Sequence, residues 1–310
     1  LHVRSRRQRQ MCIRDRGTMS LLQAIIMGII QGVTEFLPVS SSGHLAIFKI
    51  LFHMETDTGL LFDVILHLGT LIAIFAVYYK DILRMIVEGV CIIRDVCINI
   101  ARFFRNKFMH EENEYLKIVK NGYRKFVMLV IVSTIPTGVI GYAASDLVTM
   151  ASQILLVPGI CLIVTSVLLF IADRIQTGHK GPKNISYTNG FIIGICQGIA
   201  TLPGLSRSGT TIASCLISGF DRKFAVKYSF IMSIPAVLGA AILELKDFSP
   251  ASVSGTEVAY YLVGMAVAAV VGYICIKTML VIVRNKKFTI FSIYCLLMGA
   301  FSIGAYFYMA

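Results

Sequence analysis

The chain contains no tryptophan, and only 15% of its 310 residues are charged. Its mean hydropathy is +0.76, and 56% of the residues are hydrophobic. A soluble domain of this length could not bury so much apolar surface, so the composition predicts a polytopic membrane protein. The chain also lacks CxxC pairs, Walker-type phosphate loops, HExxH and GxSxG, which excludes several common zinc, nucleotide and serine-hydrolase signatures.

Cysteine is present without a metal-binding pattern. The eight cysteines have no zinc-type spacing, and all except Cys12 lie in apolar runs. We therefore expect small buried hydrophobic side chains, with neither a disulfide framework nor a metal cluster.

Positive charge is concentrated at the start of the chain. Residues 1–18 hold six of the 29 Lys and Arg residues and have no apolar core, which excludes a signal peptide. We interpret them as an artefactual, non-native tail and expect the native chain to begin at Met19. Without them the net charge falls from +12 to about +7, which loop topology explains without nucleic-acid binding.

Several apolar runs are long enough to span a bilayer. They cover residues 62–79, 126–144, 154–172, 226–245, 258–280 and 289–309. Two further apolar segments, residues 20–52 and 189–218, are interrupted by clusters of Pro, Gly and Ser. Neither half of either segment is long enough to span, so each is predicted to be a re-entrant helical hairpin.

Basic residues lie on alternate loops. Residues 80–125 hold ten Lys and Arg, whereas the loops at the opposite ends of the spans together hold one. The positive-inside rule therefore predicts that the basic loops are cytoplasmic. Within residues 80–125 we expect an amphipathic interfacial helix over 82–101, and the charged residues 102–125 to form a solvated connector.

The two interrupted segments are copies of one another at a shift of 166 residues. The identical pairs are Gly28/Gly194, Ile29/Ile195, Gln31/Gln197, Gly32/Gly198, Ser40/Ser206, Ser42/Ser208 and Gly43/Gly209. The predicted topology gives the copies opposite orientations, which makes them an inverted-topology repeat with a site where the hairpin tips meet. We predict one all-α membrane domain over 19–310, with repeat 1 at about 19–172 and repeat 2 at about 189–310.

The first tip places a carboxylate and an imidazole in an apolar segment. Glu35 shares a helix face with Gln31, and an idle carboxylate there is costly. Glu35 therefore either pairs two helices electrostatically or acts as a metal ligand or general base. His44 is either a satisfied core residue or an acid, base or nucleophile. The serines between them, followed by Gly43, form either a simple turn or an anion cradle; they are Ser40, Ser41 and Ser42.

The second tip carries Arg207 where the first has a serine. An intramembrane arginine needs an anionic partner, which is either a phosphate group or Glu35. The neighbouring hydroxyls and glycine extend the candidate site; they are Ser206, Ser208, Gly209 and Thr211. Asp63 and His67, four residues apart, either support this site or are polar groups at a helix end.

At these residues the chain resembles the undecaprenyl-diphosphate phosphatase (bacitracin-resistance) family. Its (Glu/Gln)xxxGlu, PVSSxGH and PGxSRSxxT motifs stand here at Gln31–Glu35, Pro38–His44 and Pro203–Thr211. The resemblance covers residues 19–310. It implies hydrolysis of undecaprenyl diphosphate at the outer face of the bacterial inner membrane, which recycles the lipid carrier for cell-wall polymers and lowers bacitracin sensitivity. A divalent cation, Mg²⁺ or Ca²⁺, is the implied cofactor.

The resemblance also implies residue roles. Arg207 would grip the diphosphate, Glu35 would assist metal binding or catalysis, and either Ser41 or His44 would attack phosphorus. The implied diphosphate-binding residues are Gln31, Ser40, Ser42, Gly43, Ser206, Ser208, Gly209 and Thr211. Because Gln31 replaces a carboxylate, a cation chelated by the diphosphate is favoured over a two-carboxylate site.

A second hypothesis is a lipid-carrier flippase or transporter, because inverted repeats are common in transporters. The expected partners are a polyprenyl diphosphate and membrane lipids, without nucleic acid, and the sequence leaves homo-oligomerisation open.

Overall fold

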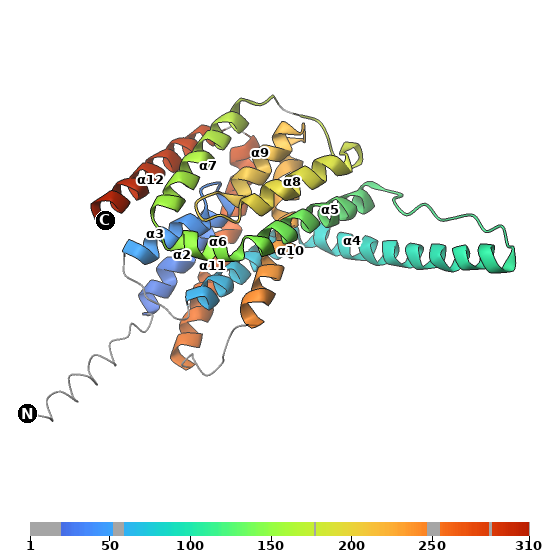
Figure 1. Ribbon diagram of the computed structural model, residues 1–310, viewed down its shortest axis with the longest axis horizontal. Coiled ribbons are helices and arrows are strands. Elements are labelled where there is room, and N and C mark those ends of the chain that lie inside the picture. Colours follow the sequence, from blue (N-terminus) through green and yellow to red (C-terminus); the bar gives the residue numbers. More distant parts are fainter. Residues whose placement is uncertain (1–19, 52–58, 177, 247–254, 285–286, 310) are drawn as a thin grey trace, which may run out of the picture.

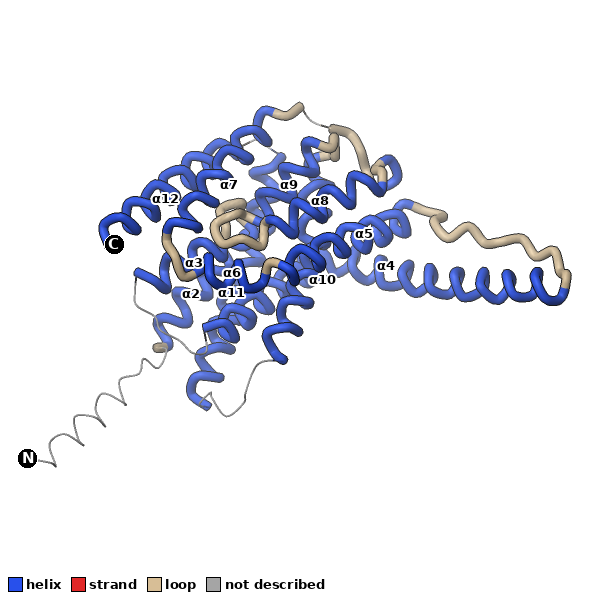
Figure 2. The backbone as a smooth tube through the Cα atoms, in the orientation of Figure 1, coloured by secondary structure: helices blue, strands red, loops and turns tan. Residues whose placement is uncertain are grey.

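The computed structural model describes residues 20–51, 59–176, 178–246, 255–284 and 287–309. The predicted non-native tail, residues 1–18, and the predicted start at Met19 lie outside these ranges. Within them, regular structure is helical apart from one isolated bridge between Lys180 and Phe220 (Figures 1 and 2). The elements are α2 (Leu21–Phe36), α3 (Ser41–Leu51), α4 (Gly59–Met109), α5 (Gly122–Ala143), α6 (Ser145–Ser152), α7 (Leu156–Arg174), η1 (Pro182–Asn184), α8 (Tyr187–Ile199), α9 (Arg207–Ile217), α10 (Arg222–Lys246), α11 (Gly255–Arg284) and α12 (Phe288–Met309).

Among the described residues, six helices are long and apolar enough to cross a bilayer: α4, α5, α7, α10, α11 and α12. They coincide with the six spans expected from hydropathy, so the prediction of an all-helical, multi-pass membrane protein is confirmed. Large apolar side chains such as Ile135 and Val270 point outward from these helices, as lipid-facing residues must. The interior contains an aromatic group around the fully buried rings of Phe126, Phe220 and Tyr228.

Helix α4 differs from the sequence prediction. It runs for 51 residues, which is about 76 Å and far more than the ~30 Å bilayer core requires. Its backbone is non-helical at Tyr78 (φ −107°, ψ 20°), and beyond this kink the helix projects from the bundle as an arm (Figure 1). The expected separate helix at 82–101 is therefore part of α4. The expected connector has narrower bounds than the predicted 102–125, because α4 continues to Met109 and α5 begins at Gly122.

The polar side of the arm explains why charges interrupt its apolar pattern. The extended segment 110–121 runs back along α4, and Asn99 exchanges hydrogen bonds with the backbone of Leu116 at 2.8 and 2.7 Å (Figure 2). The fully buried carboxylate of Asp95 accepts hydrogen bonds from Arg124 (2.7 Å) and Lys120 (2.9 Å). These pairs fasten the connector to α4, so it is ordered by side chains of the helix instead of being a free loop.

The two interrupted segments form short helices joined by breaks. Helices α2 and α8 have 16 and 13 residues, fewer than the ~20 needed to span. Each packs closely on a long helix through a glycine. A Cβ added at Gly28 would lie 2.6 Å from the carbonyl oxygen of Gly264 in α11, and one added at Gly194 would overlap the carbonyl of Ser133 in α5. The repeat-equivalent glycines therefore serve equivalent helix crossings.

The described cysteines are all free thiols, as expected for a chain without a disulfide framework. Cys215 and Cys295 are buried as predicted, whereas Cys97 is exposed on the arm of α4.

We expect Gly194→Ala to lower the free energy of unfolding by about 1–3 kcal/mol, because its methyl group would overlap the backbone of α5. Gly138→Ala is the matched control: it lies in α5 and has no other residue near its Cβ position, so it should be neutral or slightly stabilising. Thermal unfolding of the purified protein in detergent measures both. Equal melting temperatures for the two variants would contradict the close α5–α8 contact.

Candidate active site

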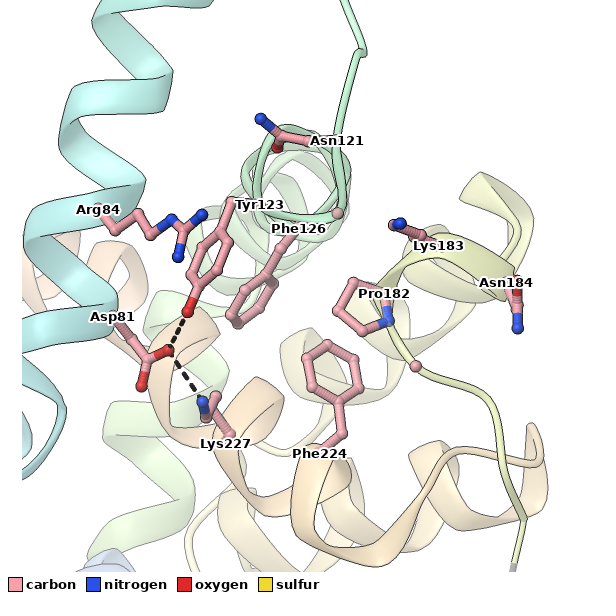
Figure 3. Close-up of a pocket in the computed structure, with 12 residues that line it drawn as sticks. Asp81, Arg84, Asn121, Tyr123, Phe126, Pro182, Lys183, Asn184, Phe224 and Lys227 are labelled. Atoms are coloured by element: carbon pink, nitrogen blue, oxygen red, sulfur yellow. Dashed lines mark hydrogen bonds and ion pairs between the residues drawn. The ribbon is translucent and has the colours of Figure 1, made fainter.

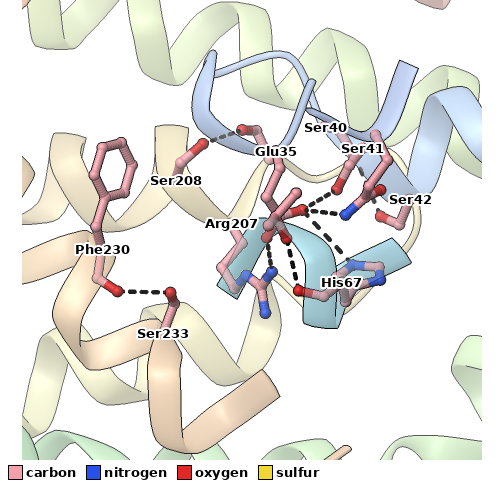
Figure 4. A network of polar contacts seen from close by, with 12 residues as sticks. Glu35, Ser40, Ser41, Ser42, His67, Arg207, Ser208, Phe230 and Ser233 are labelled. Carbon is pink, nitrogen blue, oxygen red and sulfur yellow. Dashed lines mark hydrogen bonds and ion pairs between the residues drawn. The ribbon is translucent and has the colours of Figure 1, made fainter. Parts of the chain in front are cut away.

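Glu35, in the last turn of α2, is the centre of a polar network (Figure 4). One carboxylate oxygen, Oε1, forms an ion pair with the Nη2 of Arg207. The other, Oε2, accepts hydrogen bonds from Ser41 Oγ (2.6 Å) and Gln31 Nε2 (3.1 Å), and lies 3.6 Å from His67 Nε2. The structure thus joins residues from both sequence copies around one carboxylate.

The first break is built by local backbone chemistry. Helix α2 ends because Leu37 adopts an extended conformation before Pro38. Ser40 then takes a positive φ of 71°, which is uncommon for a residue other than glycine. Its hydroxyl accepts a hydrogen bond from the Gly43 amide at 3.2 Å and so caps the start of α3.

The second break repeats this arrangement. Gly204 adopts a φ of 93°, and the Ser206 hydroxyl accepts from the Gly209 amide at 3.1 Å to cap α9. In both breaks the capping serine also lies 3.4 Å from the hydroxyl two residues later, which is Ser42 in the first and Ser208 in the second. Ser40 and Ser206 therefore cap α3 and α9 at equivalent positions of the two copies.

The two breaks lie against each other. A Cβ added at Gly43 would be 2.7 Å from the Cα of Gly204, and one added at Gly209 would be 3.3 Å from Pro38 Cβ. Ser41 and Arg207, which occupy equivalent repeat positions, are the first residues of α3 and α9. Glu35 is thus held by the N-terminal residues of two helices, where the helix dipoles favour negative charge.

The site is nearly closed. The exposed fraction of the side chain is 8% for Glu35 and 23% for Arg207. The cavity beside them has a volume of about 10 Å³, which is room for at most about one water molecule. Of the two partners expected for Arg207, a phosphate group or Glu35, the structure shows Glu35 in contact with it. The Nε and Nη1 groups of Arg207 donate to no side chain or carbonyl in the described part of the protein, so they are available to a further anion.

His44 is directed toward α12. Its Nδ1 donates to the carbonyl of Ser40 at 2.7 Å, and its Nε2 is 2.7 Å from the hydroxyl of Tyr294. The two rings stack with centroids 5.6 Å apart and an interplanar angle of 5°. Tyr294 was not among the candidate residues, because a single tyrosine in an apolar helix gives no sequence signal.

His67, on α4, faces the carboxylate instead. Its Nδ1 donates to the carbonyl of Asp63 at 2.8 Å, which leaves Nε2 directed toward Glu35. The side chain of Asp63 forms an ion pair with Lys49 at 2.5 Å. Of the two residues left open by the sequence, His67 therefore contacts the site directly and Asp63 orients it through its backbone.

The remaining candidate residues differ in their distance from Glu35 along the network. Ser208 Oγ donates to the Leu37 carbonyl at 3.5 Å and so contacts the first break. Thr211 lies one turn into α9, where its hydroxyl pairs with Ser229 of α10 at 2.5 Å and donates to the Arg207 carbonyl at 2.8 Å. Thr211 therefore fixes α9 against α10, one step away from the carboxylate.

The residues around Glu35 provide few ligands for a divalent cation. Among the described residues, no three His, Cys, Asp or Glu side chains lie together so that they could hold a metal ion. Within the described ranges, Gln31 Oε1 is buried without a partner, and so is Gln197 Oε1 at the equivalent position of the second copy. One carboxylate and one amide oxygen fall short of the six or more oxygens that Mg²⁺ or Ca²⁺ takes. The residues fit a cation only if a bound diphosphate completes its shell.

Comparisons with known proteins match nearly the whole chain, including both breaks. Residues 24–301 match the model of a family described as bacitracin resistance protein BacA. A protein of Methanosphaera stadtmanae, named undecaprenyl-diphosphatase, is 39% identical over 92% of this chain and 98% of its own length. Proteins of the same name from Alkaliphilus metalliredigens (38% identity, 92% and 98% covered) and Methanobrevibacter smithii (39%, 91% and 96%) are similar over nearly the same length. A match of this extent, together with the two joined tips, means that the chain belongs to the bacitracin resistance protein BacA family.

Proposed function

We propose that the protein hydrolyses undecaprenyl diphosphate to undecaprenyl phosphate and inorganic phosphate. This reaction recycles the lipid carrier of cell-wall polymers and accounts for bacitracin resistance. The name shared by its relatives supports the substrate and reaction. The observation that carries the proposal is the contact of Arg207, Ser41 and Glu35 inside an apolar bundle, because it combines an anion-binding group, a hydroxyl and a proton acceptor.

In the proposed reaction Arg207 binds the diphosphate through its Nε and Nη1 groups and stabilises charge on the phosphoryl oxygens. Ser41 is well placed to attack, because its hydroxyl already donates to Glu35 Oε2. The Oγ–P bond would form as the bridging P–O bond breaks, with the serine proton passing to Glu35 and undecaprenyl phosphate leaving. Water then hydrolyses the phosphoserine and releases phosphate.

His44 remains the alternative nucleophile, and its contact with Tyr294 would fix its ring for that role. His67 is a further candidate proton carrier, since its Nε2 faces Glu35. The other proposed diphosphate ligands are Gln31, Ser40, Ser42, Gly43, Ser206, Ser208, Gly209 and Thr211.

We further propose that a divalent cation acts at this site, held by Glu35 together with the diphosphate oxygens. Such a cation would neutralise charge on the diphosphate. Gln31 Oε1, which has no hydrogen-bond partner in the described part of the protein, would be a further oxygen ligand on the same helix face.

We also propose that the two broken segments are re-entrant hairpins of an inverted-topology repeat. Equivalent caps at Ser40 and Ser206, and equivalent glycine contacts of α2 with α11 and α8 with α5, support this reading. We propose a bacterial inner-membrane location with the site facing the periplasm, and the basic loops support this orientation. A flippase could use the same repeat, but the relatives' name favours hydrolysis.

We predict that Arg207→Ala lowers the rate of phosphate release from a polyprenyl diphosphate by about 10²–10³-fold, because the phosphoryl charge loses its main donor. Arg174→Ala is the control, because it removes the same charge at a different place. Arg174 stacks on Phe170 at the end of α7. The assay is done in detergent, where no sealed bilayer exists for a flippase. An unchanged rate in Arg207→Ala would exclude the proposed site.

Ser41→Ala should lower turnover by at least about 10³-fold if Ser41 is the nucleophile. Ser214→Ala on α9 is the control, because its hydroxyl only donates to the Thr210 carbonyl. A single-turnover reaction quenched in acid should leave phosphate on Ser41, where a phosphoserine is acid-stable. Phosphate retained on His44 after a parallel quench in base, where phosphohistidine is stable, would reverse the assignment.

Chelation of divalent cations should abolish turnover. The Gln31→Glu substitution adds a second carboxylate beside Glu35, so it should lower the cation concentration that restores half of the activity. Gln23→Glu is the control on the same helix, at the capping position two turns earlier. A shift of equal size in both variants would place the cation elsewhere.

A further inference from the structure

A second and larger cavity lies away from Glu35, between α4, α5, η1 and the start of α10 (Figure 3). Its volume is about 650 Å³, which is in the range of small-ligand sites. None of its lining residues belongs to the Glu35 network. The residues that matter for its chemistry are Arg84, Tyr123, Phe126, Lys183, Phe224 and Lys227.

The charge of this cavity is positive. Asp81 is the carboxylate in its lining, and it is already engaged by Lys227 Nζ and the Tyr123 hydroxyl, both at 2.9 Å. Arg84 lies over the ring of Tyr123, with its guanidinium carbon 4.2 Å from the ring centroid. Across the described ranges, neither Arg84 nor Lys183 has a carboxylate within ion-pair distance. Both cations therefore lack a direct ion pair within the described ranges, and Glu88, which interacts electrostatically with Arg84, is itself paired with Arg124.

The opposite wall is apolar. The rings of Phe126 and Phe224 meet edge to face with centroids 5.2 Å apart, and Pro182 lies beside them (Figure 3). The chain of Lys183 passes over Gly122, whose Cβ position lies 3.4 Å from Lys183 Cγ, at the first turn of α5. The ammonium group is thus close to a helix N-terminus, which adds to the positive potential. A ligand that suits both walls carries an anionic group and an apolar part.

We propose that this cavity binds a phosphate group, with Arg84 and Lys183 as its ligands and the phenylalanine wall in contact with an attached apolar chain. Phosphate suits the planar donors of Arg84 and the point charge of Lys183. A lipid head group and free inorganic phosphate share this chemistry, and the aromatic wall favours the lipid. The basic loops place the cavity on the face predicted to be cytoplasmic, where the head groups of the inner leaflet lie.

The cavity can be tested separately from the catalytic site. Helix α10 borders both, with Phe224 and Lys227 at the cavity and Phe230 and Ser233 beside Glu35. The proposed phosphate site is tested by ligand binding, whereas the proposed reaction is tested by phosphate release, so the two tests are independent. The failure of one therefore leaves the other intact.

Because the chain contains no tryptophan, a single introduced tryptophan can report ligand binding by its fluorescence. Asn184→Trp introduces a single fluorophore at the edge of the cavity, on an exposed residue. The detergent-solubilised protein is titrated with dihexanoyl phosphatidic acid, with inorganic phosphate, and with zwitterionic dihexanoyl phosphatidylcholine. We expect a saturable emission change with phosphatidic acid and weaker binding of phosphatidylcholine. Saturable binding of inorganic phosphate alone would also support the phosphate site and identify the free ion as its ligand.

Arg84→Ala or Lys183→Ala in this background should raise the half-saturating concentration by at least about tenfold, since each removes a charged donor. Lys117→Ala is the matched control, an exposed lysine on the connector that runs along α4, and it should have no effect. Arg207→Ala should also leave the signal unchanged. The proposal is overturned if no phosphate probe saturates, if Lys117→Ala weakens binding as much as Lys183→Ala, or if Arg207→Ala removes the signal.

Discussion

The ion pair between Glu35 and Arg207 is the interaction on which the centre of this protein depends. A carboxylate and a guanidinium withdrawn from water into an apolar bundle are each costly, and each is tolerated because the other is present. The two residues are 172 positions apart in sequence, so the pair requires the two breaks to lie side by side. Ser41 and His67 complete the surroundings of the carboxylate, so four elements of the chain converge on one side chain.

Breaks in helices inside a membrane protein are tolerated only when their backbone groups find partners within the protein. The second break meets this condition through Thr165 of α7, whose hydroxyl donates to the Gly204 carbonyl at 3.1 Å and accepts from the Ser206 amide at 2.9 Å. In the first break the carbonyl of Ser40 accepts from His44. The same polar side chains therefore satisfy the broken backbone and surround the carboxylate, which explains why they are clustered in otherwise apolar segments.

The closed state of the site bears on how a diphosphate would enter. A space of about 10 Å³ cannot hold a phosphate group, so entry requires Arg207 and Glu35 to separate at least in part. Arg207 keeps partial exposure and two unengaged donor groups, which allows it to bind an anion before it leaves Glu35. Glu35 would then lose its countercharge, and the hydrogen bond from Ser41 would be what still stabilises the charged carboxylate.

The sequence by itself determined the membrane class, the six spans and the residues at the two tips. Long apolar runs have one physical solution in a bilayer, and polar clusters inside them are costly unless they form a site. What only the tertiary structure decided was the choice among partners. It directed His44 to Tyr294 and His67 to Glu35, because helix packing sets which face of α3 and α4 meets the carboxylate. It also extended α4 to Met109, since Asp95 and Asn99 are satisfied by residues that lie far along the chain and that local pattern cannot identify.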